Sequence, residues 1–313
     1  MAITTSNALS SGALRIYLES VAIKNFKRRT VFIEMGERRQ MESGSHTYVF
    51  SLMDASTKTL AQATIQEGVT PVTSALSSRQ VSVSMNQLGD FATLSDLIVK
   101  DNPFPLVDAA ALEISRIMAQ NADILVQNVL NTGANTIIKT IGDVTTIRGS
   151  LVLADTIRSK RLAEAFTRLQ SAAAPTYDND YVAVVHPKVV HDLLIESATG
   201  GFIELAKYQQ SVKIFNGEIG KLYGVRIIVG NNVQPFVGAG TGPIDVYPTY
   251  VFGSNAYGIV ESQTLESIVQ PFGSEGSADP LRQRMTIGLK MRFGAALLKT
   301  ESLWRIESSV SIA

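Results

Sequence analysis

A single long amphipathic helix is the feature that most constrains the fold of this chain. Apolar residues recur at spacings of three and four between Leu106 and Leu130, which is the pattern of a helix that buries one face. The segment closes on Asn131-Thr132-Gly133, whose glycine suits a left-handed helix C-cap. About 25 residues at ~1.5 Å each predict a rod of roughly 37 Å, which is longer than the usual helix of a globular protein.

Upstream of this helix, the sequence predicts a long β-hairpin with weakly apolar arms. One arm extends from Thr47 to about Ile65, and the other, from Arg79 to Asn86, alternates apolar residues with serines. Glu67, Gly68 and Pro71 lie between the arms in a turn-like setting. An arm of about 15 residues extends roughly 50 Å. Since a two-stranded ribbon is marginally stable alone, we expect this one to lie on another surface.

Downstream of the helix, the pattern predicts a mixed α+β fold. A short strand is expected near Ser150–Ala154, a helix from about Asp155 to Ala173, and a buried strand at Tyr181–Val185. Pro187 then suits the first turn of another helix. Beyond residue 220 the chain is predicted to be largely β, with strands over 225–229, 250–261, 284–293 and 304–312.

Residues 1–46 carry a basic cluster and lack the pattern of a compact unit. Such segments are more often arms that reach out than parts of a core, so we predict an arm that meets solvent or another subunit. Nucleic acid is the alternative partner, although no motif for sequence-specific reading is present. The basic residues are Lys24, Lys27, Arg28, Arg29, Arg38 and Arg39.

Composition favours a subunit that is covered by its neighbours. Charged residues make up 18% of the chain and apolar residues 45%, against about 25% charged in typical soluble domains. The 28 basic and 28 acidic residues cancel, which lets like subunits associate without strong repulsion. No apolar run is long enough to span a membrane, and the first residues lack the pattern of a signal peptide, so a cytoplasmic origin is expected.

Motifs for catalysis or cofactor binding are weak. The chain has no cysteine, which excludes disulfides and thiolate chemistry. His186 and His191 are five residues apart, which does not place two imidazoles on one helix face. Asp279, Arg282 and Arg284 suggest an ion-pair or interface cluster. We therefore expect no cofactor and no metal, although carboxylate pairs leave a cytosolic α+β enzyme open as an alternative.

Several short motifs follow one another in a specific order over most of the chain. They are Glu67-Gly68-Val69-Thr70-Pro71 through Leu88-Gly89-Asp90-Phe91, Leu130-Asn131-Thr132-Gly133, Val185-His186-Pro187, Gly220-Lys221-Leu222-Tyr223-Gly224, and Asp279-Pro280-Leu281-Arg282-Gln283-Arg284 with Gly288-Leu289-Lys290. Their joint order resembles the major capsid proteins of tailed bacteriophages with the Hong Kong 97 type fold, and in particular the podovirus N4-like major capsid protein family.

The resemblance implies a domain plan and a set of contacts. The plan has an N-terminal arm (1–46), an extended loop or β-hairpin (47–90), a peripheral domain with a spine helix at about 106–130 (91–180), a mainly axial domain (181–260), and C-terminal strands returning to the peripheral domain (261–313). Residues expected at assembly contacts are the six basic residues above, Lys58, Glu67, Gly68 and Pro71 on the hairpin, and Asp279, Arg282 and Arg284.

The implied function is a structural subunit without a cofactor. Copies would form homo-pentamers and homo-hexamers of an icosahedral head around non-specifically bound double-stranded DNA, assembled in the bacterial host cytoplasm with portal and scaffolding or decoration proteins as partners. An encapsulin-like nanocompartment shell shares the fold and would hold protein cargo instead. A sheath or surface-layer subunit, forming tubes or flat lattices, is a further alternative.

Overall fold

The computed structural model describes residues 16–18, 20–26, 30–41, 45–54, 64–65, 67–68, 73, 77–101, 106–196, 218–274 and 279–312. Its helices are a first segment over 16–18 and 20–26, α2 Phe32–Met35, α4 Asp96–Asp101, α5 Leu106–Gly133, α6 Ser159–Ser171 and α7 Pro187–Ile195. Its strands are β1 Glu37–Gln40, β2 Thr47–Asp54, β3 Ser77–Ser84, β4 Asn86–Ser95, β5 Asn135–Ile138, β6 Tyr181–Val185, β7 Glu218–Leu222, β8 Val225–Val229, β9 Tyr247–Phe252, β10 Tyr257–Gln270, β11 Arg284–Leu297 and β12 Leu303–Ser308.

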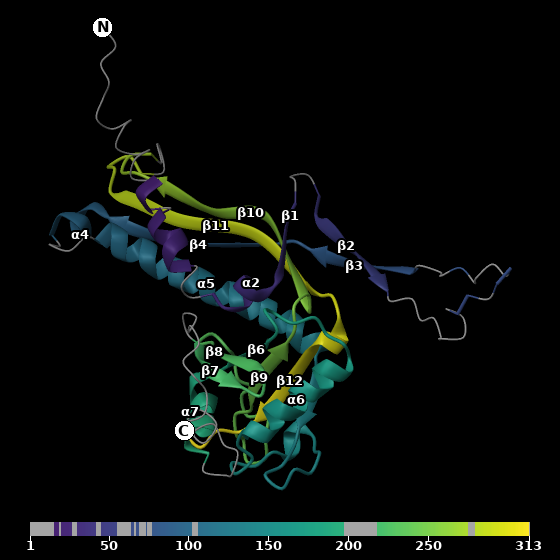
Figure 1. Cartoon of the computed structure of the whole chain (residues 1–313). Coiled ribbons are helices and arrows are strands. Elements are labelled where there is room, and N and C mark those ends of the chain that lie inside the picture. The colour runs from purple at the N-terminus through teal and green to yellow at the C-terminus, as the bar shows by residue number, and fades with distance from the viewer. Residues whose placement is uncertain are drawn as a thin grey trace.

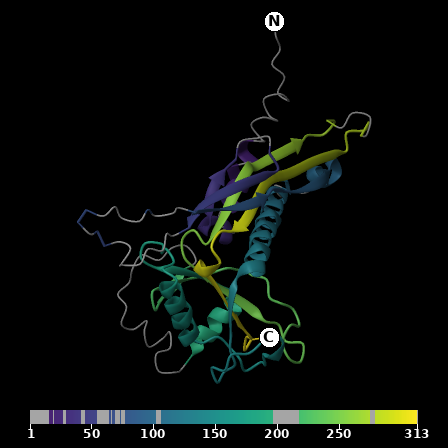
Figure 2. The same ribbon diagram turned by 90° about the vertical axis from the view of Figure 1, so that its right-hand side faces the viewer.

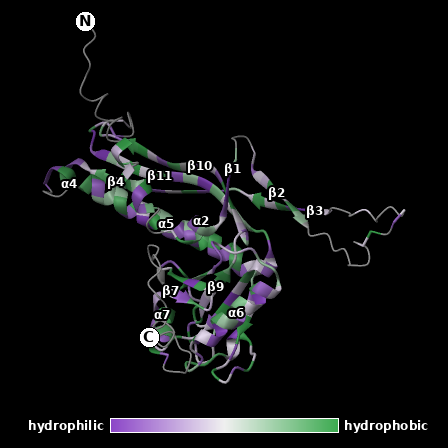
Figure 3. Ribbon diagram, in the orientation of Figure 1, coloured by the Kyte–Doolittle hydropathy of each residue, from purple (hydrophilic) through white to green (hydrophobic). Residues whose placement is uncertain are grey.

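A four-stranded sheet and the long helix α5 form one half of the molecule. The strand order is β1-β10-β11-β4, in which β10, β11 and β4 are antiparallel neighbours and β1 runs parallel to β10. Helix α5 lies along one face of this sheet against β11 and β4 (Figures 1 and 2). Apolar and polar segments alternate along α5 (Figure 3), as expected of a helix that buries one face.

A six-stranded sheet forms the other half, in the order β5-β12-β9-β6-β8-β7. Strand β6 lies inside it and is buried along its whole length, because both faces of the sheet are covered. Val182 and Val184 join the large core with α5, whereas Ala183 and Val185 pack with residues of α6 and α7. Alternate side chains of one strand therefore connect two cores.

The described part of the first 46 residues packs into the molecule. Leu18, Ala22 and Phe26 of the first helix, and Phe32 and Ile33 of α2, are buried in the same core as α5. The prediction that this segment reaches out instead of joining a core is therefore wrong for residues 16–26 and 30–41 as far as the structure describes them. The basic cluster suggested an arm, but the apolar residues between the cations decide where the chain lies.

The grouping of strands also differs from the domain plan. Strand β12 lies in the six-stranded sheet between β5 and β9, whereas the plan returned residues 261–313 to the domain that carries the long helix. Strand β5 and helix α6, from the 91–180 stretch, also belong to this half. Parallel pairing of β12 with β5 joins segments more than 160 residues apart, and sequence periodicity carries no information about such partners.

Three local predictions need correction. The strand expected near Ser150–Ala154 is absent there; a 3₁₀ turn at Arg148–Ser150 precedes an irregular segment. The run over 250–261 is two strands, β9 and β10, separated at Gly253–Ala256. The first hairpin arm was expected to reach Ile65, but β2 ends at Asp54, whose partner Ser77 is the first residue of β3. Residues 64–65 are not in a strand.

Candidate functional site

The ribbon of β2 and β3 projects away from both sheets (Figure 1). Its root is held by Phe50 and Val83, which are buried against Val260, Ala296 and Leu298. Glycines allow this close approach, because a Cβ at Gly258 would overlap the Phe50 ring and one at Gly294 would overlap the Ser84 backbone. The ribbon is therefore anchored at one end by a small core of its own.

The two faces of the ribbon differ in burial. Tyr48, Phe50 and Leu52 turn toward the small core, while Val49 and Met53 on the opposite face are 48% and 70% exposed. An isolated exposed apolar residue is ordinary. Two on the same face of a strand that leaves the body, however, form a small apolar surface that is open to solvent in the single chain.

The predicted hairpin residues are only partly placed. Glu67 and Gly68 are exposed in a turn, and Gly68 has a φ of +79°, which favours glycine. Lys58 and Pro71 lie outside the described residues. Their role at subunit contacts stays a prediction.

The predicted basic cluster is described only in part. Lys24 is exposed on the first helix, and Lys27, Arg28 and Arg29 lie outside the described residues. Arg38 donates from Nε to the Ile33 carbonyl at 3.0 Å, and Arg39 forms a 2.6 Å ion pair with Glu37. The two arginines therefore already have partners in their own segment.

Asp279 has a local structural role. Its carboxylate accepts a 2.8 Å hydrogen bond from the backbone N–H of Arg284, at the start of β11. The side chains of Arg282 and Arg284 are exposed, and neither forms an ion pair with Asp279 among the residues that the structure describes. The ion-pair interpretation is therefore wrong, because Asp279 begins a strand and leaves both arginines at the surface. A role of these residues at subunit contacts stays a prediction.

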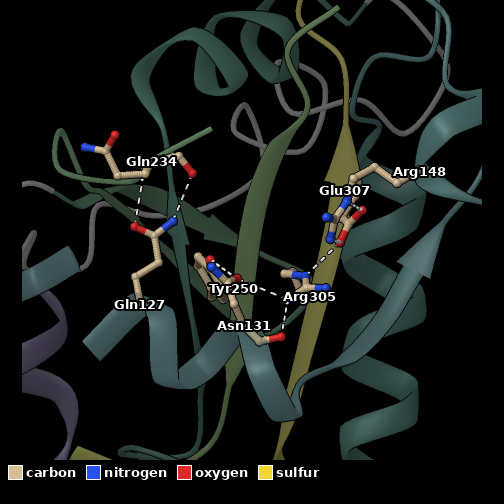
Figure 4. A network of polar contacts seen from close by, with 7 residues as sticks. All are labelled: Gln127, Asn131, Arg148, Gln234, Tyr250, Arg305 and Glu307. Carbon is tan, nitrogen blue, oxygen red and sulfur yellow. Dashed lines mark hydrogen bonds and ion pairs between the residues drawn. The ribbon is translucent and has the colours of Figure 1, made fainter. Parts of the chain in front are cut away.

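A polar stripe on α5, not singled out by the sequence analysis, joins the two halves of the molecule. Asp123, Gln127 and Asn131 are spaced by four residues and so share one helix face. Gln127 makes a reciprocal pair with the backbone of Gln234, at 2.9 and 3.0 Å. Asn131 accepts from the hydroxyl of Tyr250 at 2.6 Å (Figure 4). The spacing of four residues can be read from the sequence, but the partners of these side chains cannot.

The same network continues into a buried carboxylate. Glu307 on β12 is fully buried and accepts two hydrogen bonds from Arg148, at 2.6 and 2.7 Å, and one from Arg305 at 2.8 Å (Figure 4). The Arg148 guanidinium also lies 3.6 Å from the centre of the Phe236 ring. Charge-assisted and bidentate bonds are the strong ones in proteins. They fix the loop that carries Arg148 onto the six-stranded sheet.

That loop carries an exposed apolar group, which we call the apolar loop tip. It packs on the glycine-rich loop around Gly240, since Thr241 donates through its backbone N–H to Leu151 and through Oγ1 to Gly149. Several of its side chains face solvent in the single chain, among them Val144 at 64% and Ile147 at 71% exposure. The members on this loop are Ile141, Val144, Ile147, Val152 and Leu153, and the group also includes the exposed Val237 of the glycine-rich loop.

His186 has a structural role at the start of α7. His186 accepts a hydrogen bond from the backbone N–H of Lys188 and so caps α7, while its ring lies 4.8 Å from that of Tyr247. Burial lowers the pKa of His186 below its usual range.

Over the described residues, no group of three or more potential metal ligands comes together. Within the same part of the chain, no helix combines the length and apolarity that a membrane crossing needs.

Comparison with known proteins identifies the family. The model of the phage capsid protein family matches residues 79–306. No curated protein sequence matches the chain at a significant level.

Solved structures agree along nearly the whole chain. The capsid of Ralstonia phage GP4 is 13% identical, with 90% of this chain and 92% of that chain covered and a TM-score of 0.71. The capsid of cyanophage P-SCSP1u is 15% identical over 88% and 87% of the two chains, with a TM-score of 0.62. The virus-like particle from Pyrococcus furiosus is 14% identical over 92% and 97%, with a TM-score of 0.55.

The family match covers well over half of the chain, and the fold is similar to those of solved phage capsid proteins along nearly the whole chain. The sequence and the fold therefore indicate the same family. The chain belongs to the phage capsid protein family and is a major capsid protein with the Hong Kong 97 type fold.

Proposed function

We propose that this capsid protein closes into pentamers and hexamers of an icosahedral phage head around double-stranded DNA. The observation that carries the proposal is the ribbon, whose outer face exposes Val49 and Met53 while its root is fixed to the body. A surface of this kind gains free energy when a neighbouring copy covers it. The head would form in the bacterial host cytoplasm.

The two halves of the molecule fit the two domains that such a subunit needs. We assign the four-stranded sheet with α5 to the peripheral domain and the six-stranded sheet to the axial domain. The apolar loop tip then lies on the axial domain, where further copies would meet it. Support comes from the separate cores on either side of β6.

The proposal also includes partners other than further copies of this chain. A closed head that is filled with DNA needs a portal, and its assembly involves scaffolding or decoration proteins. The exposed Lys24, together with the other basic residues near it in the sequence, would attract phosphates without reading bases. A specific relationship to N4-like capsid proteins is part of this proposal.

Met53→Asp tests the role of the ribbon. A charge at this exposed position opposes burial against a neighbour but leaves the small core at the root intact. We expect the variant to purify as folded subunits that form no shells by negative-stain electron microscopy. Met53→Leu keeps the apolar surface and is the matched control, which should form shells as the unmodified protein does.

The outcomes separate the alternatives. Shells from Met53→Asp at the same protein concentration would show that the ribbon face makes no essential contact. A monomer or dimer of the unmodified chain under all assembly conditions would favour the enzyme alternative. Nucleic acid inside particles purified from infected cells supports the phage head, while protein cargo supports a nanocompartment.

A further inference from the structure

The face of the four-stranded sheet that is turned away from α5 carries a small apolar notch. Helix α5 packs against the opposite face (Figure 2), where alternate residues of β11, such as Ile287 and Leu289, join the large core. The residues between them point to the other side of the sheet, which we call the outer face. This face is built mostly from polar residues and glycines, among them Gln87, Thr93 and Thr286.

The notch lies where two exposed apolar side chains flank a glycine. Gly288 of β11 pairs with Phe91 of β4 on one side and with Ile268 of β10 on the other. Phe91 is 69% exposed and Ile268 is 42% exposed. Neighbouring strands lie about 4.8 Å apart, so these two side chains stand roughly 10 Å apart with no side chain between them. The open cavity here, of about 260 Å³, has room for one bulky aliphatic side chain. We call it the sheet notch.

Cations stand on both sides of the sheet notch along β11. Lys290 lines the cavity two residues beyond Gly288, about 7 Å along the strand, and Arg284 lies roughly 13 Å away in the other direction. Neither cation forms an ion pair among the residues that the structure describes.

The carboxylates near the notch already have hydrogen-bond partners. Glu266, which is opposite Lys290 in the register of β10 and β11, accepts from Nε2 of Gln263 at 2.7 Å. Asp90 accepts from the backbone N–H of Phe91 at 2.9 Å. The outer face therefore offers two cations to the negative charge of a partner.

The composition of the outer face indicates which kind of partner fits. Obligate contacts between copies are rich in apolar surface, whereas proteins that fold separately and then associate meet through surfaces about as polar as the rest of the molecule. The outer face is of the second kind, because its apolar part is a single notch with cations beside it. An extended acidic segment is complementary to it, since side chains two residues apart in such a segment repeat at the ~7 Å that separates the notch from Lys290.

We propose that an accessory protein of the head binds the outer face through an extended acidic segment. One bulky aliphatic side chain of this segment enters the sheet notch over Gly288, and a carboxylate two residues away pairs with Lys290. The contact rests on the proposed function, since it adds a different protein to the head that this chain forms. It gives the scaffolding or decoration partner a position on the subunit and a chemistry of recognition.

The probe for this site is a fluorescently labelled synthetic peptide with one leucine and a glutamate two residues to either side of it. Fluorescence anisotropy measures its binding to the unmodified protein and to two variants. Phe91→Ser removes one wall of the notch at an exposed position, and Lys290→Glu reverses the charge beside it. We expect the peptide to bind the unmodified protein and to bind each variant at least about ten-fold more weakly.

Matched controls separate the site from general charge effects. Lys24→Glu makes the same charge reversal at an exposed residue of the first helix, which packs against α5 on the other side of the sheet, and it should bind the peptide as the unmodified protein does. A peptide with serine in place of the leucine should bind at least about ten-fold more weakly. In a cryo-EM reconstruction of particles from infected cells, we expect density over Gly288 that belongs to a chain other than the capsid protein.

Each other outcome has a definite meaning. Absence of peptide binding, or equal binding by the unmodified protein and both variants, overturns the site. Tighter binding of a labelled DNA duplex than of the peptide, lost in the same two variants, would identify a nucleic-acid surface and also overturns it. Density from a neighbouring copy, or an empty notch, overturns the accessory protein as the occupant. Failure of the unmodified protein to form shells overturns the proposed function, whereas peptide binding by the subunit would still support the chemistry of the outer face.

Discussion

The carboxylate of Asp123 on α5 accepts a 3.0 Å hydrogen bond from the side chain of Asn232, which follows β8. It also accepts a 3.1 Å bond from the backbone N–H of Val31, the residue before α2. One buried side chain therefore connects the long helix, the N-terminal segment and a loop of the six-stranded sheet. Burial raises the pKa of Asp123 to about 6, although its hydrogen bonds lower the pKa in part.

Asp123→Asn should remove a pH dependence of stability. Because its pKa is raised by folding, Asp123 contributes stability that is fully present below pH ~4 and is lost as the pH rises through 6. From about pH 4 to 7, the unfolding free energy of the unmodified subunit should fall by about 3 kcal/mol relative to the variant, at ~1.4 kcal/mol per pKa unit. Urea unfolding at a series of pH values measures this difference, and a constant difference would contradict the assignment.

Arg148→Met should destabilise the subunit strongly. Glu307 is fully buried, and the variant leaves it with Arg305 as its remaining cationic partner. Breaking a buried pair from one side costs roughly 3 kcal/mol or more, which urea unfolding would measure. The control is Arg116→Met, because Arg116 pairs with Glu113 at the surface, where solvent screens the charges. Its midpoint should stay unchanged, and equal effects of the two substitutions would refute the argument.

Gly294→Ala should loosen the root of the ribbon. A Cβ at this position would overlap the Ser84 carbonyl and approach Cγ1 of Val83 to 2.8 Å, so β3 has to move away from β11. Overpacking of this kind costs about 1–3 kcal/mol, and proteolytic cleavage within the ribbon should become faster. Gly149→Ala is the control, since a Cβ there meets no atom within 4 Å. Unchanged cleavage in Gly294→Ala would show that the root tolerates the displacement.

The sequence predicted well those elements whose pattern is local. The helix expected over 106–130 extends over Leu106–Gly133, because its periodicity persists for seven turns. In β11, Met285, Ile287 and Leu289 are buried as their alternation indicated. Pro187 begins α7 as predicted, with His186 as its cap.

Features that depend on distant partners were not predictable. Asp123 and Gln127 would be expected to disfavour a buried helix face, yet loop residues 107 to 109 positions away satisfy them. The apolar residues of the first segment are too few to form a core alone, and they become buried because α5 supplies the rest of it. The cations of that segment can be read directly from the sequence, whereas the burial of its apolar residues depends on contacts with α5, which the sequence does not show.

The position of β12 has a consequence for synthesis of the protein. Residues 303–308 lie between β5 and β9 in the six-stranded sheet, so neither neighbour can complete its pairing before these residues have left the ribosome. A nascent or prematurely terminated chain therefore lacks an inner strand, not an edge. Translation itself therefore delays completion of this sheet until residue 308 has been synthesised.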